Sequence, residues 1–198
     1  MDRLTVETSL TLVRPDASHR EMYLAMVADY EAAGEARYQP LVEVLNTDFE
    51  GYVRHLKNWA LGLNLKPGWV PCTVYWSVAD GLPYIVGELH IRHWLTPALE
   101  REGGHIGYTI APSMRRKGLG TLQMALGMEK AREILETDRV LVTCDTDNVG
   151  SARVIENNGG VFEDHAVSER SGKQINRYWI TLSPSRKPYG SSETLGVC

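Results

Sequence analysis

The short stretch "RRKGLG", from Arg115 to Gly120, places three cations and two glycines between a strand-like run and a helical one. Helices usually begin at Ser, Thr, Asp or Asn, so a Gly-x-Gly at this point needs another reason. The unpaired N–H groups and partial positive charge of a helix N-terminus can bind phosphate. Because glycine has no side chain, Gly118 and Gly120 would let those N–H groups reach a pyrophosphate directly. The stretch therefore predicts a phosphate site, with a solvated basic turn as the alternative.

Two common nucleotide-binding motifs do not fit this turn. The chain contains no Gly-x-x-x-x-Gly-Lys-Ser/Thr loop, which excludes the P-loop type of phosphate site. The three-glycine spacing of the dinucleotide-binding fold is also missing, and the run before the turn is not the first strand of a βαβ series. The phosphate site, if it forms, belongs to another class of fold.

A second set of reactive side chains lies in the strand-like run "YIVGELHIRHWL", residues 84–95. Strand alternation places Glu88, His90 and Arg92 on one face. Charged residues in a central strand are costly unless they line a cleft, which favours a functional role for Glu88. The alternative is a salt bridge between Glu88 and Arg92. His90 and His93 form a His-x-x-His pair, but this spacing puts them on opposite faces, so we expect no shared metal.

The elements that must position these residues alternate between strands and helices. We expect strands at residues 5–15, 72–79, 84–95, 105–111, 139–145, 159–168 and 175–182, and helices at 18–34, 47–62, 118–135 and 148–158. Residues 96–104 read as a polar loop. This order predicts an α/β or α+β fold, with helices on both faces of one sheet.

Local signals set the expected limits and faces of the helices. Ser-x-x-Glu and Thr-x-x-Glu capping boxes, Ser18 with Glu21 and Thr47 with Glu50, open the first two helices. In the third helix, the residues that recur at helical spacing are Leu122, Ala125, Leu126 and Glu129. The glycines at 159 and 160 end the fourth helix.

Composition indicates one soluble domain and argues against several other classes of protein. The 198 residues carry a formal net charge of -4, which argues against a general nucleic-acid binder, and no apolar run has membrane-spanning length. The three cysteines, Cys72, Cys144 and Cys198, are widely spaced, so we expect no disulfide framework or zinc site and a cytoplasmic location. We expect the domain to span residues 1–182 and residues 183–198 to form a flexible tail.

The segment "IAPSMRRKGLGTLQMAL" resembles the acetyl-CoA-binding segment of the GNAT acetyltransferases, whose pattern is Arg/Gln-x-x-Gly-x-Gly/Ala. Arg115, Gly118 and Gly120 match its fixed positions, and Pro112 stands three residues before the arginine, as is typical. The later segment "VLVTCDTDNVGSARVIENNGG" resembles the strand and helix that follow in this family. More narrowly, the chain is similar to a bacterial branch of predicted acetyltransferases. The resemblance covers roughly residues 10–182 and is strongest over 104–160.

The resemblance implies a GNAT-like mixed, mostly antiparallel sheet that splays apart beside the strand holding the cofactor. The donor would be acetyl-CoA, and no metal is implied. Its pantetheine arm would pair with the main chain at Ile110 and Ala111, and its far side would meet Asn148 and Ser151. Asn148 is equally well explained as a helix N-cap, and Ser151 as an ordinary first-turn residue. The pyrophosphate would lie on the turn formed by Arg115, Arg116, Lys117, Gly118, Leu119, Gly120 and Thr121.

The chemistry that the resemblance implies is attack of a neutral amine on a thioester. An alkylamine with a pKa of about 10.4 is mostly protonated at neutral pH, so a general base is useful. Glu88, directly or through water, is one candidate, and His105 is the other, since relatives often carry a glutamate at that position. A main-chain N–H around Ile110 would stabilise the oxyanion.

The family commonly uses a tyrosine on the short helix to protonate the leaving thiolate, but the matching position here holds Ile155. Solvent or another tyrosine could serve instead. The strand tyrosines Tyr75, Tyr108 and Tyr178 are candidates, although each is more simply a packed aromatic residue.

The first hypothesis is an N-acetyltransferase that transfers an acetyl group from acetyl-CoA to a primary amine by direct attack in a ternary complex. The amine could belong to a small molecule or to a peptide, and the sequence leaves this open. We expect no nucleic-acid or membrane partner, and a homodimer is possible. A non-catalytic acyl-CoA-binding sensor on the same scaffold and a nucleotide-phosphate enzyme are the alternatives.

Overall fold

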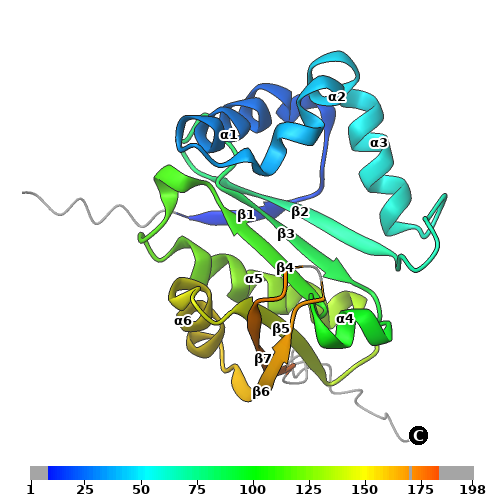
Figure 1. Ribbon diagram of the computed structural model, residues 1–198. Helices are drawn as coiled ribbons and strands as arrows, with labels where there is room; N and C mark the ends of the chain where they lie inside the picture. The colour runs from blue at the N-terminus through cyan, green and yellow to red at the C-terminus, as the bar shows by residue number, and fades with distance from the viewer. Residues whose placement is uncertain (1–8, 170, 183–198) are drawn as a thin grey trace, which may run out of the picture.

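In the part of the chain that the structure describes, residues 9–169 and 171–182, seven strands form one mixed sheet (Figure 1). Their order across the sheet is β1-β2-β3-β4-β5-β7-β6, and β4 and β5 are parallel while the other neighbours are antiparallel. The computed structural model therefore confirms the expected mixed, mostly antiparallel sheet. The strands are Leu10–Val13 (β1), Cys72–Ala79 (β2), Gly87–Arg92 (β3), Ile106–Ile110 (β4), Arg139–Asp145 (β5), Val161–Val167 (β6) and Gln174–Thr181 (β7).

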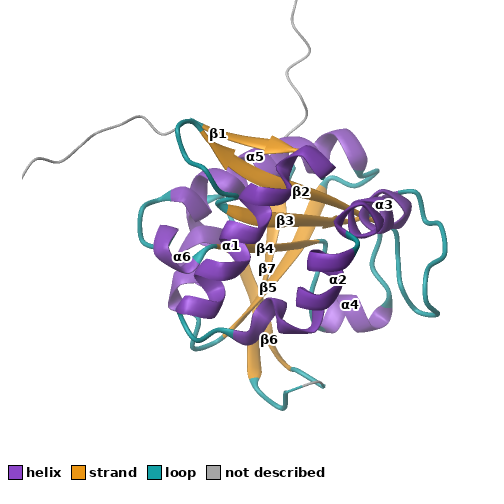
Figure 2. Cartoon of the chain, turned by 90° about the horizontal axis from the view of Figure 1, so that it is seen from above, coloured by secondary structure: helices purple, strands orange, loops and turns teal. Residues whose placement is uncertain are grey.

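Helices cover both faces of the sheet, as the element order predicts. The helices α1, α2 and α3 gather on one side of β1 to β3, and α5 and α6 lie on the other side (Figures 1 and 2). Three 3-10 turns, at Ala17–His19, Ala36–Leu41 and Pro112–Met114, connect these elements. The helices are Arg20–Ala32 (α1), Val42–Thr47 (α2), Phe49–Ala60 (α3), Pro97–Arg101 (α4), Leu119–Ile134 (α5) and Val149–Asn157 (α6).

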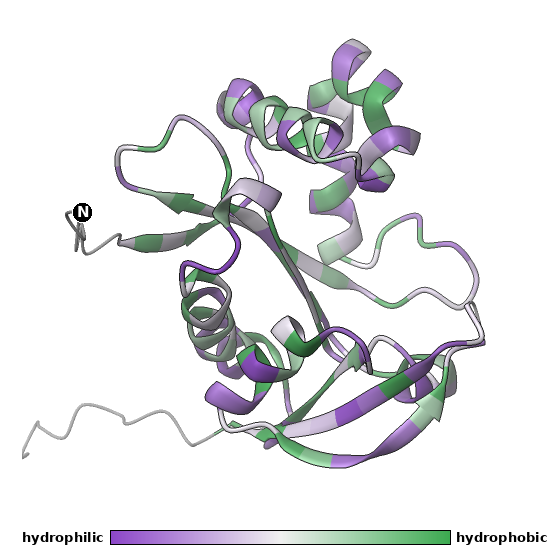
Figure 3. Cartoon of the chain, turned by 60° about the vertical axis from the view of Figure 1, so that its left-hand side comes forward, coloured by the Kyte–Doolittle hydropathy of each residue, from purple (hydrophilic) through white to green (hydrophobic). Residues whose placement is uncertain are grey.

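The two helical layers give the protein two hydrophobic clusters. One lies between the sheet and α1 to α3 and includes Trp76, and the other lies between the sheet and α5 and α6 and includes Leu89. Figure 3 shows hydrophobic segments of the strands between the two groups of helices. Because both faces are covered, β2 is buried along almost its whole length instead of at alternate residues.

The buried face of α5 differs from the expected stripe. Leu122 is exposed, while Gln123 is fully buried and its amide Nε2 donates to Ser77 Oγ at 2.7 Å. At Gly127, an added Cβ would lie 2.8 Å from Leu89 Cδ2, so α5 sits close against β3 only because this residue is small. The stripe prediction was wrong because the buried face is built partly from a glutamine and a glycine, which carry no hydrophobic signal. The buried residues are Leu119, Gln123, Met124, Gly127, Met128 and Ala131.

Two helical segments begin at aspartates and not at the predicted Ser/Thr capping boxes. Asp16 accepts a hydrogen bond from Ser18 N at 3.0 Å, at the 3-10 turn that precedes α1. Asp48 caps α3 and accepts from Gly51 N at 2.9 Å, whereas Thr47 ends α2 and donates to Glu43 O. Both capping-box predictions were therefore wrong, because an equally good cap residue lies one or two positions away.

Two short helices were not expected from the sequence. The predicted polar loop at 96–104 contains α4, whose cap is Thr96 with Oγ1 accepting from Leu99 N at 3.3 Å and whose first residue is Pro97. The helix α2 follows a 3-10 turn and packs against α3. Both helices are too short to show a clear period in the sequence.

The ends of the chain extend past the described residues. The first strand was expected at 5–15 and is observed as Leu10–Val13, and residues 5–8 of that expectation lie outside the described part. The expected tail at 183–198, including Cys198, also lies outside it. Over the residues that are described, no helix combines the length and the apolarity that crossing a membrane requires.

Candidate functional site

The strands β4 and β5 diverge from each other soon after they meet. Among the described residues, Ile106 and Val142 form the one registered pair between them, whereas β4 pairs with β3 from Ile106 to Ile110. The junction is held by His105, whose backbone N donates to Leu141 O at 2.7 Å and whose Nδ1 accepts from Leu141 N at 3.0 Å. Beyond this junction, the side of β4 that faces β5 has no strand partner.

The alternation of β4 decides which main-chain groups face this open side. Ala111 N donates to Val86 O at 2.8 Å, so its N–H is already used on the β3 side. In an antiparallel pair, the next residue turns its N–H and C=O the other way. Ile110 therefore points its main chain toward β5, and its carbonyl accepts hydrogen bonds from Tyr30 OH and Arg115 Nε, both at 3.0 Å. Of the two main-chain positions expected to hold a cofactor, Ile110 is the one whose N–H faces the open side, while its carbonyl is already occupied.

The turn between β4 and α5 has two residues in the left-handed region. Arg116 has a φ of 64° and Gly118 a φ of 81°, and Gly118 is the N-cap of α5. An added Cβ at Gly118 would meet nothing within 4 Å, so the glycine is needed for its backbone angle and not for space. The first N–H groups of a helix lack intrahelical partners, so those at Leu119 and Gly120 are suited to binding an anion. Thr121 N already donates to Gly118 O at 3.1 Å, so the cofactor contact expected for Thr121 is not offered by its N–H.

Gly120 serves a different purpose from Gly118. An added Cβ there would lie 3.2 Å from Val154 Cγ2 and 3.6 Å from Ile110 Cγ1. The glycine therefore lets the first turn of α5 approach both β4 and α6. The exposed cations Arg116 and Lys117 lie just before this turn and add positive charge to it.

Arg115 is engaged by other side chains. Its Nη1 and Nη2 donate to the two carboxylate oxygens of Glu35 at 2.6 and 2.9 Å, and its guanidinium lies 5.6 Å from the ring centre of Tyr30. Hydrogen bonds from Arg115 hold the pKa of Glu35 below its usual range. The arginine thus ties the turn to the loop after α1, with its head group directed at Glu35.

Asn148 and Ser151 lie at the start of α6, across the open side from β4. Asn148 is the N-cap, and its Oδ1 accepts from Ser151 N at 3.0 Å. Ser151 Oγ lies 3.0 Å from Tyr108 OH, so a strand residue and a helix residue meet here. One turn further along α6, Ile155 is fully buried and contributes only apolar packing.

Glu88 is a buried carboxylate surrounded by aromatic hydrogen-bond donors. Its side chain is 5% exposed, and it accepts from Tyr23 OH at 2.9 Å, Tyr38 OH at 2.7 Å and Trp76 Nε1 at 3.2 Å. Arg92 instead donates to the carbonyls of Gly103 and Gly104, so the expected alternative of a Glu88–Arg92 salt bridge is wrong.

The protonation of Glu88 is set by competing effects. Burial acts to raise the pKa of this carboxyl, but the neighbouring His90 and the hydrogen bonds from Tyr38 and Tyr23 outweigh it, and the pKa lies below its usual value. His90 Nε2 is 3.9 Å from Glu88 Oε2, and the imidazole is partly exposed. Glu88 is therefore ionised at neutral pH, next to a group that reaches solvent.

His105 has a different environment. Burial, together with the charge of Arg92, lowers the pKa of His105 to about 4. Its Nδ1 lone pair is already used by Leu141 N–H, and its ring lies 6.4 Å from that of Trp179. The structure thus separates the two base candidates: Glu88 is on the face with α1, and His105 is fixed at the β4–β5 junction.

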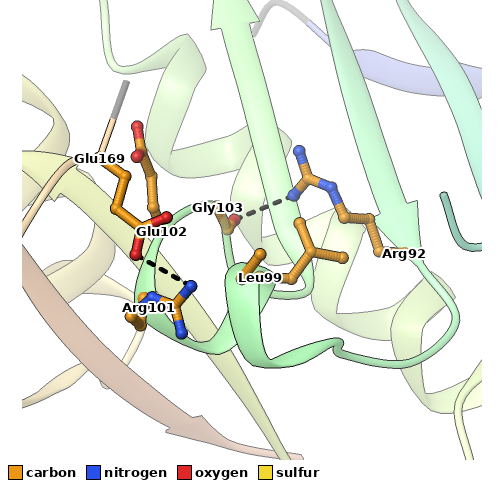
Figure 4. A pocket seen from close by; sticks show the side chains of 7 residues that line it. Arg92, Leu99, Arg101, Glu102, Gly103 and Glu169 are labelled. Atoms are coloured by element: carbon orange, nitrogen blue, oxygen red, sulfur yellow. Dashed lines mark hydrogen bonds and ion pairs between the residues drawn. The ribbon is translucent and has the colours of Figure 1, made fainter. Parts of the chain in front are cut away.

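Two pockets lie at different places, one beside the site and one away from it. One, of about 540 Å³, lies between α1, the following 3-10 turn and α2, and is lined by Tyr30 and Tyr38, whose hydroxyls contact Ile110 O and Glu88. The other, of about 400 Å³, lies at α4 between Arg92 and the Arg101–Glu169 ion pair (Figure 4). None of the residues that line this second pocket belongs to the expected site.

The described cysteine and histidine side chains lie apart from one another and do not gather at one site. Cys72 and Cys144 are buried, and burial raises their thiol pKa values to about 12 and about 11. His93 Nε2 lies 2.9 Å from Thr73 Oγ1, away from the contact that His90 makes with Glu88. Among the described residues, no three His, Cys, Asp or Glu side chains cluster as metal ligands would.

Sequence reasoning missed the tyrosines that complete the site. Tyr23 and Tyr30 belong to α1, and Tyr38 to the 3-10 turn after it, yet their hydroxyls reach β3 and β4. A weak signal was present, because Tyr23 and Tyr30 are seven residues apart and so share one helix face. The sequence shows that this face is buried, but not which strand residues lie beneath it.

One known protein family matches most of the chain. A family model described as "Acetyltransferase (GNAT) domain" matches residues 9–161. No curated protein has a significantly similar sequence.

Solved structures share the fold at low sequence identity. RimJ of Mycobacterium smegmatis, in complex with CoA-disulfide, is 18% identical with a TM-score of 0.65, over 90% of this chain and 84% of that one. RimL, a ribosomal α-N-protein acetyltransferase in complex with coenzyme A, is 19% identical with a TM-score of 0.61, over 89% and 96% of the two chains. A chimera of spermidine N-acetyltransferase SpeG from Vibrio cholerae is 16% identical with a TM-score of 0.58, over 87% and 95%.

Proposed function

The chain belongs to the GNAT acetyltransferase family and is an acyltransferase, and from this premise we propose that it transfers the acetyl group of acetyl-CoA to a primary amine. The observation that carries the proposal is the open side of β4, which leads directly to the N-terminus of α5. An extended pantetheine arm needs main-chain partners, and a pyrophosphate needs N–H donors and positive charge. The chain offers both in sequence along one path.

The donor is assigned to this path from the residues upward. The pyrophosphate lies against the N–H groups of Gly118, Leu119 and Gly120, in the field of Arg116 and Lys117. The pantetheine runs along β4 past Ile110, with Asn148 and Ser151 on its far side. Arg115 positions the turn through Glu35 and Ile110 O, and its side chain is a brace for the turn more than a phosphate ligand.

The amine attacks the thioester carbonyl from the side of the sheet that faces α1. The nitrogen forms a bond to the carbonyl carbon, and its proton passes through water to Glu88, whose carboxylate is ionised and therefore always ready to accept it. Ile110 N–H stabilises the oxyanion that forms. The C–S bond then breaks, and its electron pair leaves with sulfur. His105 holds the β4–β5 junction and takes no proton.

Direct attack is favoured over an acetyl-enzyme intermediate. A thiol nucleophile must be a thiolate, and both described cysteines are buried with raised pKa values. The amine therefore reacts with acetyl-CoA itself in a ternary complex.

The acceptor is assigned to the pocket between α1 and α2. Tyr30 and Tyr38 line it and connect it to Ile110 and Glu88. Glu31 and Glu43 are exposed on its walls, which suits an acceptor that arrives as a cation. Amine acceptors of two kinds, a polyamine and a ribosomal protein amine, are named for the structural neighbours.

A non-catalytic acyl-CoA sensor is the second candidate, and the burial of Ile155 favours it, because no acid stands at the usual position. Release of CoA thiol from acetyl-CoA, measured over a panel of polyamines, amino acids, aminoglycosides and peptides, separates the two. Amine-dependent release supports the transferase. Binding of acetyl-CoA with no release over the whole panel supports the sensor.

A further inference from the structure

Tyr108 reaches from the cofactor strand to the helix on the far side of the open path. Its ring belongs to β4, and its hydroxyl lies 3.0 Å from Ser151 Oγ in the first turn of α6. This contact bridges β4 and α6 at a place where β4 has no strand partner. Both side chains are only half-buried.

The position of the ring is fixed by its neighbours. In the sheet, Tyr108 stands opposite Leu89, on the face that packs against α5. An added Cβ at Gly120 would lie 3.8 Å from Tyr108 Cε2, so the ring touches the first turn of α5. The hydroxyl therefore lies between the starts of two helices, α5 and α6, beside the path assigned to pantetheine.

Ser151 and Ile155 are four residues apart on α6 and so share one face of the helix. This helix face has no phenol at Ile155, but the phenol of Tyr108 contacts the same face at Ser151, one helical turn earlier. Ser151 N is held by the Asn148 cap, which fixes the start of the helix beneath the Tyr108 hydroxyl.

The other two strand tyrosines are directed elsewhere. Tyr178 OH lies 3.4 Å from Glu156 Oε1, and the ring of Tyr75 lies beneath the Arg14 guanidinium at 5.4 Å. Of the three tyrosines considered from the sequence, Tyr108 is the one that meets the first turn of α6.

We propose that Tyr108 is a catalytic residue that donates a hydrogen bond to the sulfur of CoA as the C–S bond breaks. The inference rests on the proposed function. The electron pair of the C–S bond stays on sulfur, the acetyl carbonyl re-forms, and the Tyr108 O–H stabilises the thiolate while Ser151 donates to the phenol oxygen. Water then protonates the thiolate, which balances the proton that the amine gave up through Glu88.

The electrostatics of Tyr108 agree with a donor that does not ionise. Burial raises the pKa of Tyr108 to about 12. The phenol is thus neutral at every physiological pH, and complete transfer of its proton to a thiolate of pKa about 8.5 would be uphill. Hydrogen bonding to the developing charge, with solvent as the final proton source, is the step that these values allow.

The test compares Tyr108→Phe with Tyr178→Phe, which removes a hydroxyl from a strand tyrosine outside the path. We expect Tyr108→Phe to lower kcat by about 100-fold, the lower end of the range seen when one charge-stabilising donor is lost, with the Kd for acetyl-CoA changed by less than about threefold. Tyr178→Phe should keep the wild-type kcat. Equal kcat in Tyr108→Phe and wild type, or a loss confined to acetyl-CoA binding, would overturn the inference.

A fluorinated tyrosine at position 108 separates chemistry from packing, because it strengthens the donor with little change of shape. We expect kcat to rise relative to Tyr108, and an unchanged kcat would assign the residue a packing role. This variant also keeps the test valid if Tyr108→Phe fails to fold. A wild-type protein with no amine-dependent thiol release would reject the proposed function itself, whereas an active wild type matched by Tyr108→Phe would reject only the role of Tyr108.

Discussion

His105 forms hydrogen bonds with both main-chain groups of Leu141. Its backbone N–H donates to the Leu141 carbonyl, and its Nδ1 accepts from the Leu141 N–H. This double contact joins β4 to β5 just before the Ile106–Val142 pair, after which the strands separate. A side chain that fixes the point of separation controls the width of the path assigned to acetyl-CoA. We therefore propose that His105 is a positioning residue and that Glu88 is the general base.

The first prediction concerns stability against pH. The pKa of His105 in the folded protein is lowered to about 4, against about 6.5 when unfolded, so between these values the unfolded state binds more protons. Stability contributed by neutral His105 is present above pH 6.5 and is lost as pH falls toward 4, at up to about 1.4 kcal/mol per pH unit. Denaturant unfolding of wild type and His105→Asn, measured from pH 4 to 7, checks this.

Asparagine is the matched replacement, because its Oδ1 can accept the Leu141 N–H without titrating. The stability difference between His105→Asn and wild type should shift in favour of the variant as the pH falls through this window. At neutral pH, the variant should also keep amine-dependent activity within about tenfold of wild type. Complete loss of activity in a folded His105→Asn protein would restore His105 as the base.

The second prediction uses two glycines with the same backbone requirement. Gly118 has a φ of 81° and Gly159 a φ of 83°, and an added Cβ meets nothing within 4 Å at either position. Replacement by alanine should therefore cost each site about 1 kcal/mol of stability through the left-handed angle alone. Only Gly118→Ala should also weaken acetyl-CoA binding in calorimetry, because strain at this position shifts the N–H groups of the proposed phosphate turn, and Gly159 lies outside that turn. Equal affinities for acetyl-CoA in the two variants would show that the turn at Gly118 does not bind acetyl-CoA.

The third prediction concerns charge at the turn. Arg116→Glu should raise the Kd for acetyl-CoA about tenfold, a loss of roughly 1.4 kcal/mol, by repulsion from the pyrophosphate. The effect should shrink as salt is added, because both charges are exposed to solvent. Arg54→Glu makes the same change of charge on the exposed surface of α3 and serves as control. A similar change in affinity for both variants would mean that only net charge matters.

The fourth prediction tests the base. Glu88→Gln keeps the size of the side chain and removes its charge, so kcat should fall by about 100-fold or more while acetyl-CoA binding is retained. Steady-state kinetics and calorimetry on the same preparation give the two values. The exposed change Glu129→Gln on α5 controls for loss of one carboxylate. Retained activity in Glu88→Gln would leave the buried carboxylate a structural role only.

The parts of the site that are local in sequence could be predicted from it. The strand, turn and helix around Gly118 and the Asn148 cap depend on residues a few positions apart, and the structure has a helix that begins after Gly118 and an N-cap at Asn148, as the pattern indicates. The single sheet with helices on both faces also follows from the element order, whereas the order β5-β7-β6 at its end was not predicted.

The contacts between distant elements could not be predicted in the same way. Glu88 is held by Tyr23 and Tyr38, which are 65 and 50 residues away, and no local period records such pairs. The role of Arg115 shows the same limit, because its matching motif indicates a cofactor contact while its head group binds Glu35, 80 residues away. Such long-range polar contacts depend on how the helices pack against the sheet, which no local sequence pattern records.

Following the acetyl group itself distinguishes direct transfer to an amine from binding alone and from an acetyl-enzyme. Wild-type protein is incubated with acetyl-CoA carrying an isotopic label in the acetyl group and with the best acceptor of the amine panel, and initial rates are measured while both substrates are varied. Direct transfer predicts one labelled N-acetyl product for each thiol released, with intersecting double-reciprocal lines. Tight binding of acetyl-CoA with no labelled amine product, or parallel lines that indicate an acetyl-enzyme, would contradict it.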